Sequence, residues 1–341
     1  MRTRFSLPKD AEATAPPERH GLARDEVRLM AVRPGAIASR RFRDLPELLE
    51  PGDLVVVNTS ATLAARIPAR RADGVLVPLH VSTTLDDGDW IVEVRRPAND
   101  GPDLGIEPGS QLTLPDDVTL TLLGAFPDGR PSRLWRARTE PATSAAVHLR
   151  RYGGPIRYGY LQGTYPLADY QNVYATEPGS AEMASAGRPF TADVLVRLMG
   201  RGIPVVPVVL HTGVSSPEAH EPPYPERFAV PEITARLVTS TTRAGGRVVA
   251  VGTTVTRALE TTAERDGEPH AAAGWTDLVL GPDRPARVVN GLITGLHAPE
   301  ASHLQLLEAV AGADLVAAAY RRAVAEHYLW HEFGDSMLFL P

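Results

Sequence analysis

Cysteine is absent from the 341-residue chain, and lysine occurs once, at Lys9. The absence of cysteine excludes disulfides, thiolate nucleophiles and metal or iron–sulfur sites with cysteine ligands. Because arginine supplies almost all of the positive charge, an anion would have to be bound by arginine or by backbone N–H groups. Schiff-base chemistry on lysine is disfavoured for the same reason.

Long apolar runs are also missing. No run approaches the roughly 20 residues of a membrane helix, and the N-terminus lacks the apolar core of a signal peptide, so we expect a cytoplasmic protein. The formal net charge of −6 argues against a strongly basic nucleic-acid binder but leaves room for a local basic patch. No histidine and carboxylate pattern suggests a metal, and we expect none.

Residues 70–143 have the texture of an all-β unit. Short segments with alternating or β-branched residues follow one another without helices, separated by turn formers such as Asp86-Asp87-Gly88. These segments are Val75–Val81, Trp90–Arg95, Gln111–Leu114, Val118–Leu122 and Leu134–Arg138. The pattern predicts a small β-barrel or sandwich inserted into a larger domain formed by residues 1–69 and 144–341.

The larger domain alternates strands with helices. Expected strands are Val27–Val32, Ala36–Phe42, Leu54–Val57, Ile203–Leu210, Arg247–Val251, Thr276–Leu280 and Val288–Ile293. Expected helices are Thr191–Met199, Ile233–Arg243, Val255–Glu264, Glu300–Val310 and Asp314–Tyr328. Alternation of this kind predicts an α/β domain with a mixed sheet.

The stretch Arg247–Glu264 is central to this interpretation. An apolar β-branched run leads through Gly252 into a helix that Thr253 or Thr254 can cap. Such a turn leaves backbone N–H groups beyond the carboxyl end of the strand, where ligands usually bind in open α/β sheets. An ordinary strand-to-helix connection without a ligand is the alternative.

Two further strand ends carry polar residues. His211 follows one expected strand, and Thr294 and His297 follow another. A histidine in a cleft at a strand end is a candidate acid or base, although a lone histidine is more often structural. Tyrosines also gather in the irregular region that includes Tyr158, Tyr160 and Tyr170. They suit base stacking or the packing of a long loop.

The order of motifs resembles the S-adenosylmethionine:tRNA ribosyltransferase-isomerases of queuosine biosynthesis, from about Leu45 to Leu340. The residues that match are Pro51–Asn58, Ala65-Arg66, Tyr170-Gln171, Val173–Ala175, Gly179-Ser180, Ala186-Gly187, Phe190-Thr191, Leu210-His211, Gly213, Glu226, Ala250–Thr254, Arg257, Leu259-Glu260, Leu292–Thr294, His297, Pro299, Ser302, Gly312, Tyr320 and Gly334-Asp335. Their order and spacing carry the resemblance together. The family architecture, an α/β domain with an inserted β-barrel, matches the prediction above.

The resemblance implies that S-adenosylmethionine acts as a ribosyl donor. Its ribose would move to the aminomethyl group of a 7-deazaguanine in tRNA, with release of adenine and methionine. This chemistry needs a base beside the acidifying sulfonium and a proton donor at the departing adenine. We expect no tightly bound cofactor, and a monomer that binds S-adenosylmethionine and, in the family reaction, tRNA.

The resemblance also implies roles for individual residues. The expected catalytic residues are His211, His297 and Asp335. The residues expected to bind the cosubstrate, or to balance its charge, are Gly252, Thr253, Thr254, Arg257, Glu260, Asn58, Arg66, Tyr170, Gln171 and Glu226.

Several family motifs are altered. Ala61 stands where the family usually has arginine, Tyr224 replaces a histidine, and the histidine of the segment that here reads Ala181–Phe190 is missing. The other altered segments are Val214-Ser215-Ser216, Gly295-Leu296 and Arg157-Tyr158-Gly159-Tyr160. Two alternatives therefore stay open: an enzyme that acts on S-adenosylmethionine without tRNA, and a non-catalytic adenosyl-ligand binding protein.

Overall fold

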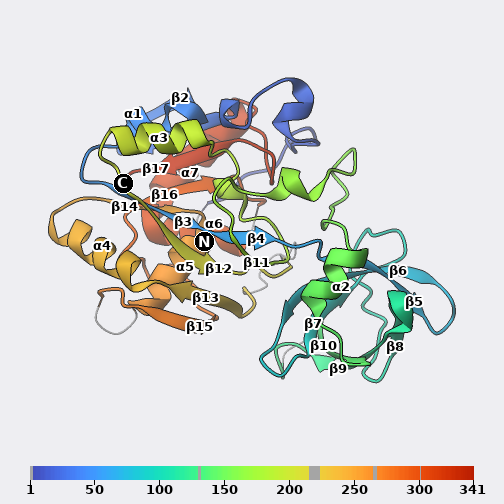
Figure 1. Ribbon diagram of the computed structural model, residues 1–341. Coiled ribbons are helices and arrows are strands. Elements are labelled where there is room, and N and C mark those ends of the chain that lie inside the picture. The colour runs from blue at the N-terminus through green and yellow to red at the C-terminus, as the bar shows by residue number, and fades with distance from the viewer. Residues whose placement is uncertain (1–2, 130–131, 215–222, 264–266, 300) are drawn as a thin grey trace.

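The computed structural model describes residues 3–129, 132–214, 223–263, 267–299 and 301–341 (Figure 1). Expectations that rest on Ser215, Ser216, Glu264 and Glu300 lie outside these residues. Within them, no helix has the length and apolarity needed to cross a membrane.

A nine-stranded mixed sheet forms the larger part of the molecule, in the order β15-β13-β12-β3-β14-β16-β17-β1-β2. Its strands are β1 (Arg28–Arg33), β2 (Ala36–Arg41), β3 (Leu54–Asn58), β12 (Val205–Leu210), β13 (Glu226–Val230), β14 (Val248–Val251), β15 (Ala272–Thr276), β16 (Gly291–Gly295) and β17 (Ser336–Phe339). The four central strands β12, β3, β14 and β16 are parallel, whereas β13 and β17 run antiparallel to their neighbours β12 and β16.

Helices cover both faces of this sheet. They are α1 (Leu45–Leu48), α3 (Ala192–Gly200), α4 (Glu232–Arg243), α5 (Thr253–Thr262), α6 (Ser302–Ala311) and α7 (Ala313–Ala325). Side chains alternate along each strand, so Val56 and Ala250 pack with α4 to α7, whereas Val55 and Val249 pack with α1 and α3. Two apolar cores result, one on each face of the sheet. Short 3₁₀ turns lie at Pro17–His20, Arg24–Glu26, Phe42–Asp44, Pro115–Asp117, Leu167–Tyr170 and Ser185–Gly187.

A closed antiparallel β-barrel lies beside the sheet, in the order β10-β7-β6-β5-β8-β9 (Figure 1). Its strands are β5 (Arg66–Arg71), β6 (Leu76–Thr84), β7 (Trp90–Val94), β8 (Gln111–Thr113), β9 (Thr119–Ala125) and β10 (Leu134–Glu140). The expected barrel is confirmed. It has one strand more than expected. The additional strand is β5, which the sequence did not reveal because only Ile67 and Ala69 are buried among its polar residues. The division of the chain at residues 70 and 143 stays a prediction.

Two chain crossings join the barrel to the sheet. The first runs through β4 (Ser60–Thr62), and the second returns through α2 (Ala145–Tyr152) to β11 (Glu177–Ser180), which pairs with β4. Polar contacts reinforce the junction: the Val214 N–H donates to Ser82 Oγ at 3.0 Å, and Asn99 Nδ2 donates to the Arg157 carbonyl at 3.0 Å. The barrel is thereby held against the sheet edge described below.

Several expected boundaries were wrong. The strand expected at Thr276–Leu280 lies earlier, at Ala272–Thr276, because it pairs with β13 in a register that ends at Thr276. The strand expected at Val288–Ile293 begins only at Gly291, since the N–H groups of residues 287–289 donate to Glu260. The N-cap of α5 is Gly252, and no side-chain cap forms there.

Candidate functional site

One edge of the sheet gathers most of the expected site residues. The parallel strands β3, β12, β14 and β16 all end at this edge. Their direction alone therefore places at this edge the residues that end or follow them: Asn58, His211, Gly252 and His297. The antiparallel strands β13 and β17 begin at the same edge, which adds Glu226 and Asp335. Carboxyl edges of parallel strands are the usual ligand sites of open α/β sheets.

Asn58 ties the centre of this edge together. Its Nδ2 donates to the Leu210 carbonyl at 2.8 Å and to Thr254 Oγ1 at 3.3 Å, and its Oδ1 accepts from the N–H groups of Leu210 and Ser60. The side chain is buried. We conclude that Asn58 aligns β12, the first turn of α5 and β4, and that its role is to position these elements.

His211 is held in a defined orientation. Its Nδ1 lies 2.7 Å from Ser60 Oγ, which in turn lies 2.6 Å from Ser180 Oγ. Gly179 packs directly against the imidazole, where a Cβ would come within 2.4 Å of the ring. Burial, with a contribution from the charge of Arg227, lowers the pKa of His211. The ring is therefore neutral at pH 7, and its Nε2 has no protein partner in the described part of the chain.

His297 is also neutral and tightly held. Its Nε2 lies 3.0 Å from Thr294 Oγ1, its N–H donates to Tyr320 Oη at 3.1 Å, and its ring stacks on His303 at 4.6 Å between centroids. Burial, followed by the charges of His303 and His331, places the pKa of His297 well below its usual value. His297 and His211 thus occupy the ends of two different parallel strands at one edge.

The turn at Gly252 has the geometry expected of a ligand-facing connection. Gly252 has φ +93°, a conformation that L-residues rarely adopt, and it directs the chain from β14 into α5. Thr254 Oγ1 accepts from Asn58 and so belongs to the edge, while the side chain of Thr253 is partly exposed beside it. The first N–H groups of a helix have no intrahelical partner, so this terminus can receive an acceptor group.

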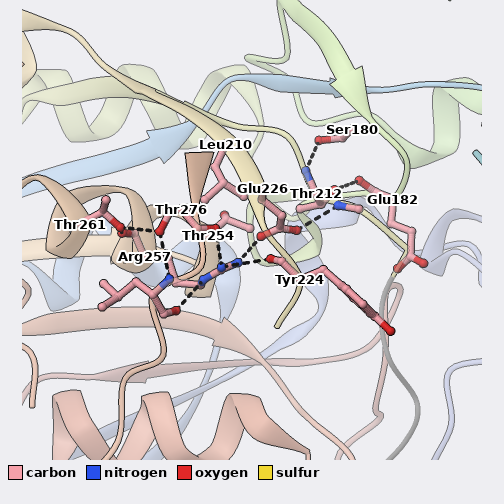
Figure 2. Close-up of polar contacts among 12 residues, drawn as sticks. Ser180, Glu182, Leu210, Thr212, Tyr224, Glu226, Thr254, Arg257, Thr261 and Thr276 are labelled. Atoms are coloured by element: carbon pink, nitrogen blue, oxygen red, sulfur yellow. Dashed lines mark hydrogen bonds and ion pairs between the residues drawn. The ribbon is translucent and has the colours of Figure 1, made fainter. Parts of the chain in front are cut away.

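Arg257 and Glu226 form an ion pair beneath this turn (Figure 2). Arg257 also donates to the carbonyls of Tyr224, Thr276 and Leu278, and the second Glu226 oxygen accepts from the Gly213 N–H at 2.9 Å. Every nitrogen of this guanidinium therefore has a protein acceptor. The expectation that Arg257 contacts the cosubstrate stays a prediction, and its observed contacts join α5 to β13 and β15.

Asp335 and Glu260 are engaged by the protein itself. Asp335 accepts from the Arg28 N–H and Nε at 2.8 and 3.0 Å and from the Leu329 N–H at 2.8 Å, at the start of β17. Glu260 lies two turns into α5 and accepts from three consecutive N–H groups of residues 287–289. Glu260 thus lies away from the edge. Asp335 lies at the edge, where its carboxylate bonds other residues of the protein.

The remaining expected residues lie in the crossings between barrel and sheet. The side-chain amide of Gln171 bonds the backbone N–H and carbonyl of Thr62 at 3.0 and 2.7 Å, and Tyr170 is buried beside Phe333. Arg66 begins β5, where its backbone pairs with Gly154 and its buried Nε has no hydrogen-bond partner among the described residues. These three residues flank the edge, outside the hydrogen-bond network of Asn58 and His211.

A row of stacked rings is connected to both histidines through hydrogen bonds. The sequence predicted a group of tyrosines here, but it did not predict their stack with His331. Tyr158 stacks on Tyr160 at 6.0 Å, and Tyr160 stacks on His331 at 4.4 Å. The two tyrosine hydroxyls donate to Glu182 and Glu332 respectively. The signal that could have located this row is the altered segment Arg157-Tyr158-Gly159-Tyr160, where the family pattern differs.

The row links both ends of the site. The Glu182 carbonyl accepts from Thr212 Oγ1, next to His211 (Figure 2). At the other end, Trp330 Nε1 donates to the His297 carbonyl at 3.0 Å, and His331 follows Trp330. No group of three or more histidine, aspartate or glutamate side chains with metal-binding geometry occurs within the described residues.

Comparisons with known proteins show the family of the chain. The family model described as queuosine biosynthesis protein matches residues 2–339. Proteins named S-adenosylmethionine:tRNA ribosyltransferase-isomerase are similar in sequence: that of Thermotoga maritima is 34% identical over 98% of both chains, and that of Azoarcus is 36% identical over 98% of this chain and 95% of the relative. The chain is also similar to the crystal structure of the S-adenosylmethionine tRNA ribosyltransferase from Thermotoga maritima. The two sequences are 30% identical, the alignment covers 100% of each chain, and the TM-score is 0.55.

Proposed function

The chain belongs to the queuosine biosynthesis protein family, and we propose that it is an S-adenosylmethionine:tRNA ribosyltransferase-isomerase. It moves the ribosyl part of S-adenosylmethionine to the aminomethyl group of a 7-deazaguanine in tRNA and releases adenine and methionine. The observation that carries this proposal is the placement of two neutral histidines at one sheet edge in a chain that matches the family along nearly its whole length. The reaction takes place in the cytoplasm with the protein as a monomer.

The first chemical requirement is a base near the sulfonium. A proton on the carbon beside the sulfonium is acidified by the positive charge, and a neutral imidazole can accept it. His211 meets this requirement, because its ring is uncharged at pH 7, Ser60 fixes its Nδ1, and its Nε2 has no partner among the described residues. We assign His211 as this base, and we assign to His297 the contact at the departing adenine, where a neutral imidazole can donate a hydrogen bond through its ring N–H.

The second requirement is that the cosubstrate be oriented. The N-terminal turn of α5, with Gly252, Thr253 and Thr254, offers backbone N–H groups and hydroxyls for polar parts of the cosubstrate. Asn58 supports this turn from below, and the Arg257–Glu226 pair fixes α5 against β13. Asp335 supports the edge by holding the start of β17 to β1.

Release of adenine tests the proposal. Purified protein is incubated with S-adenosylmethionine, with and without tRNA that carries the aminomethyl base, and adenine is measured by chromatography. We expect adenine only when the modified tRNA is present. Turnover without tRNA would replace the proposal with an enzyme that acts on S-adenosylmethionine alone, and tight binding without turnover would replace it with a binding protein.

The His297→Ala variant tests the assignment of this histidine. We expect adenine release to fall by about 10²–10⁴-fold, the range typical of a lost general acid or base. The melting temperature should change little, because the ring bonds only Thr294 and stacks on His303. A large loss of stability with activity intact would show that His297 is a structural residue.

A further inference from the structure

We propose that Glu332, backed by the stacked rings of Tyr160 and His331, is the subsite for the organic cation of the ligand. This inference rests on the proposed function, since both molecules of that reaction carry such a cation. S-adenosylmethionine has a sulfonium, and the acceptor base has a primary ammonium. The shared chemistry is a compact positive charge in a molecule that also contains a flat ring system.

The charge balance around Glu332 supports this assignment. Its Oε2 accepts from the Tyr160 hydroxyl, while among the described residues its Oε1 has no partner and the carboxylate forms no ion pair. Glu182, by contrast, lies near Arg95 and Arg133, which are bound to Glu93 in the barrel. A half-buried carboxylate without a counter-charge is unfavourable in the free protein and is compensated when a cation binds.

The rings give the carboxylate a surface that excludes water on one side. Tyr160 and His331 are nearly parallel, at 13°, with 4.4 Å between centroids, and Tyr158 continues the stack at 19°. Attraction between opposite charges is stronger where the local dielectric is low. An apolar wall beside Glu332 therefore raises its affinity for a cation, and it suits a ligand that also presents a flat ring.

The backbone that presents Glu332 is strained. His331 has φ +70°, a conformation that few residues other than glycine adopt, although histidine, asparagine and aspartate do so more often than the rest. Gly334 packs so closely that a Cβ would lie 2.3 Å from the Leu329 carbonyl oxygen, and Trp330 is anchored beneath on His297. Strain of this kind persists where the surroundings enforce it, and it clusters at ligand sites.

The position of Glu332 fits the reaction. It follows His331, whose charge acts on His297, and the tyrosine row leads from it to Glu182 and Thr212 beside His211. A cation at Glu332 would thus lie beside the chain of contacts that joins the two proposed acid–base groups. None of the residues assigned from the family resemblance supplies an unpaired carboxylate at this place, because Glu226, Glu260 and Asp335 are all bonded within the protein.

Titration calorimetry on the full chain tests the subsite with two matched ligand pairs. The first pair is S-adenosylmethionine and S-adenosylhomocysteine, which lacks the positive sulfur. The second is 7-aminomethyl-7-deazaguanine and its neutral nitrile analogue. In the unmodified protein, we expect the cationic member of one pair to bind about tenfold or more tightly, as is typical of a charge-assisted contact. The pair that shows this preference identifies the source of the cation.

The Glu332→Gln variant keeps the shape and the contact with Tyr160 while removing the charge, and should reduce that preference to about twofold or less. Glu107→Gln, at an exposed position of the barrel, removes the same charge elsewhere and should leave the preference unchanged. An unchanged preference in Glu332→Gln, or no preference in the unmodified protein, would overturn the inference. Should the preference depend on Glu332 while no adenine is released with tRNA, the subsite would stand and the proposed reaction would fail.

Discussion

At the scale of single residues, burial sets the chemistry of the histidines. His211 and His297 both have lowered pKa values, and in each the first cause is burial. Neutral imidazoles are the forms that accept protons, so the sheet edge holds both groups in the base form at pH 7. Burial also lowers the pKa of His80 in the barrel, which lies outside the proposed site. There the lowered pKa affects the stability of the protein.

The pH dependence of the reaction should reflect His211. The base is active when neutral, so kcat/KM falls as the pH decreases through the pKa of the free enzyme. Because burial lowers that pKa, we expect the acid limb to lie below pH 6.5, the ordinary value for histidine. Adenine release measured between pH 5 and 8 checks this. An acid limb above pH 6.5 would contradict the assignment of a buried neutral base.

His80 in the barrel should weaken the protein in acid. Burial, followed by the charges of Arg95, Arg66 and Arg133, lowers the pKa of His80 to about 3, although Glu93 Oε1 lies 3.6 Å from its Nδ1. The unfolded chain takes up a proton near pH 6.5, whereas the folded chain does so only near pH 3. His80 therefore does not change the free energy of unfolding above pH 6.5. Below pH 6.5 it lowers this free energy by about 1.4 kcal/mol for each pH unit.

Urea unfolding of the unmodified protein and of His80→Gln measures this effect. The variant cannot take up the proton, so its stability should decline less between pH 6.5 and 4. The difference between the two slopes isolates His80 from the carboxylates, which titrate in both proteins. Equal slopes would mean that His80 is protonated in the folded barrel.

The candidate site could be predicted from the sequence only where strand direction determines position. His211, Gly252 and His297 follow parallel strands, and Asn58 ends one, so their gathering at one edge follows from topology. The sequence could not show that Arg257, Glu260 and Asp335 are bonded within the protein, because their partners lie far away in the chain: Glu226, residues 287–289 and Arg28. Nor could it pair Tyr160 with Glu332, 172 residues apart.

At the scale of elements, the β14–Gly252–α5 connection lies at the centre of the proposed site. Gly252 has φ +93°, and a Cβ there would lie 3.3 Å from that of Ala186 in the neighbouring loop. Gly202, at the end of α3, has φ +72°, and a Cβ added there would have no atom within 4 Å among the described residues. The two glycines therefore share a positive φ but lie in different surroundings, and Gly252 also has ψ 162°.

Alanine at these two glycines should separate strain from function. Gly202→Ala is expected to lose about 1–2 kcal/mol of stability, the usual energy of a left-handed L-residue. Gly252→Ala should lose more, because φ +93° with ψ 162° lies in a region that essentially only glycine adopts. Only Gly252→Ala should also weaken the binding of S-adenosylmethionine, because it shifts the N-terminus of α5. Thermal melts and calorimetry check both effects. Equal affinities of the two variants for S-adenosylmethionine would show that the turn takes no part in binding.

The fold was predictable from the sequence where apolar periodicity is strong. The strands at Leu54–Asn58 and Val205–Leu210 and the helices at Ala192–Gly200 and Glu232–Arg243 lie close to their expected places. β5 was missed because Pro68 and three arginines hide its alternation. The α5 cap was wrong because Thr254 bonds Asn58, a contact made only in the assembled sheet.

At the scale of the whole molecule, the barrel has its own core. Its buried side chains form one apolar cluster, while those of the sheet form two others on its opposite faces. Inside the barrel, the buried carboxylate of Glu93 bonds Arg95 at 2.8 Å and also Arg133. A cluster of this kind can unfold as a unit if its internal charges lose their balance.

Removing the charge of Glu93 should destabilise the barrel first. In Glu93→Gln, Arg95 and Arg133 lose their buried counter-charge, and we expect a loss of about 3–5 kcal/mol. Scanning calorimetry should then show a separate transition at lower temperature, with the sheet transition nearly unchanged. Glu107→Gln on the barrel surface provides the control. One transition that shifts as a whole would show that barrel and sheet unfold together.

The return crossing from barrel to sheet has a consequence for how such proteins diversify. Residues 157–160 belong to no helix or strand, yet they supply two of the three stacked rings beside Glu332. Neither tyrosine belongs to the two apolar cores of the sheet, although Tyr158 packs against the core of the barrel. On the proposed function, substitutions at residues 157–160 can change which molecule is accepted while the sheet and the proposed acid–base pair stay the same.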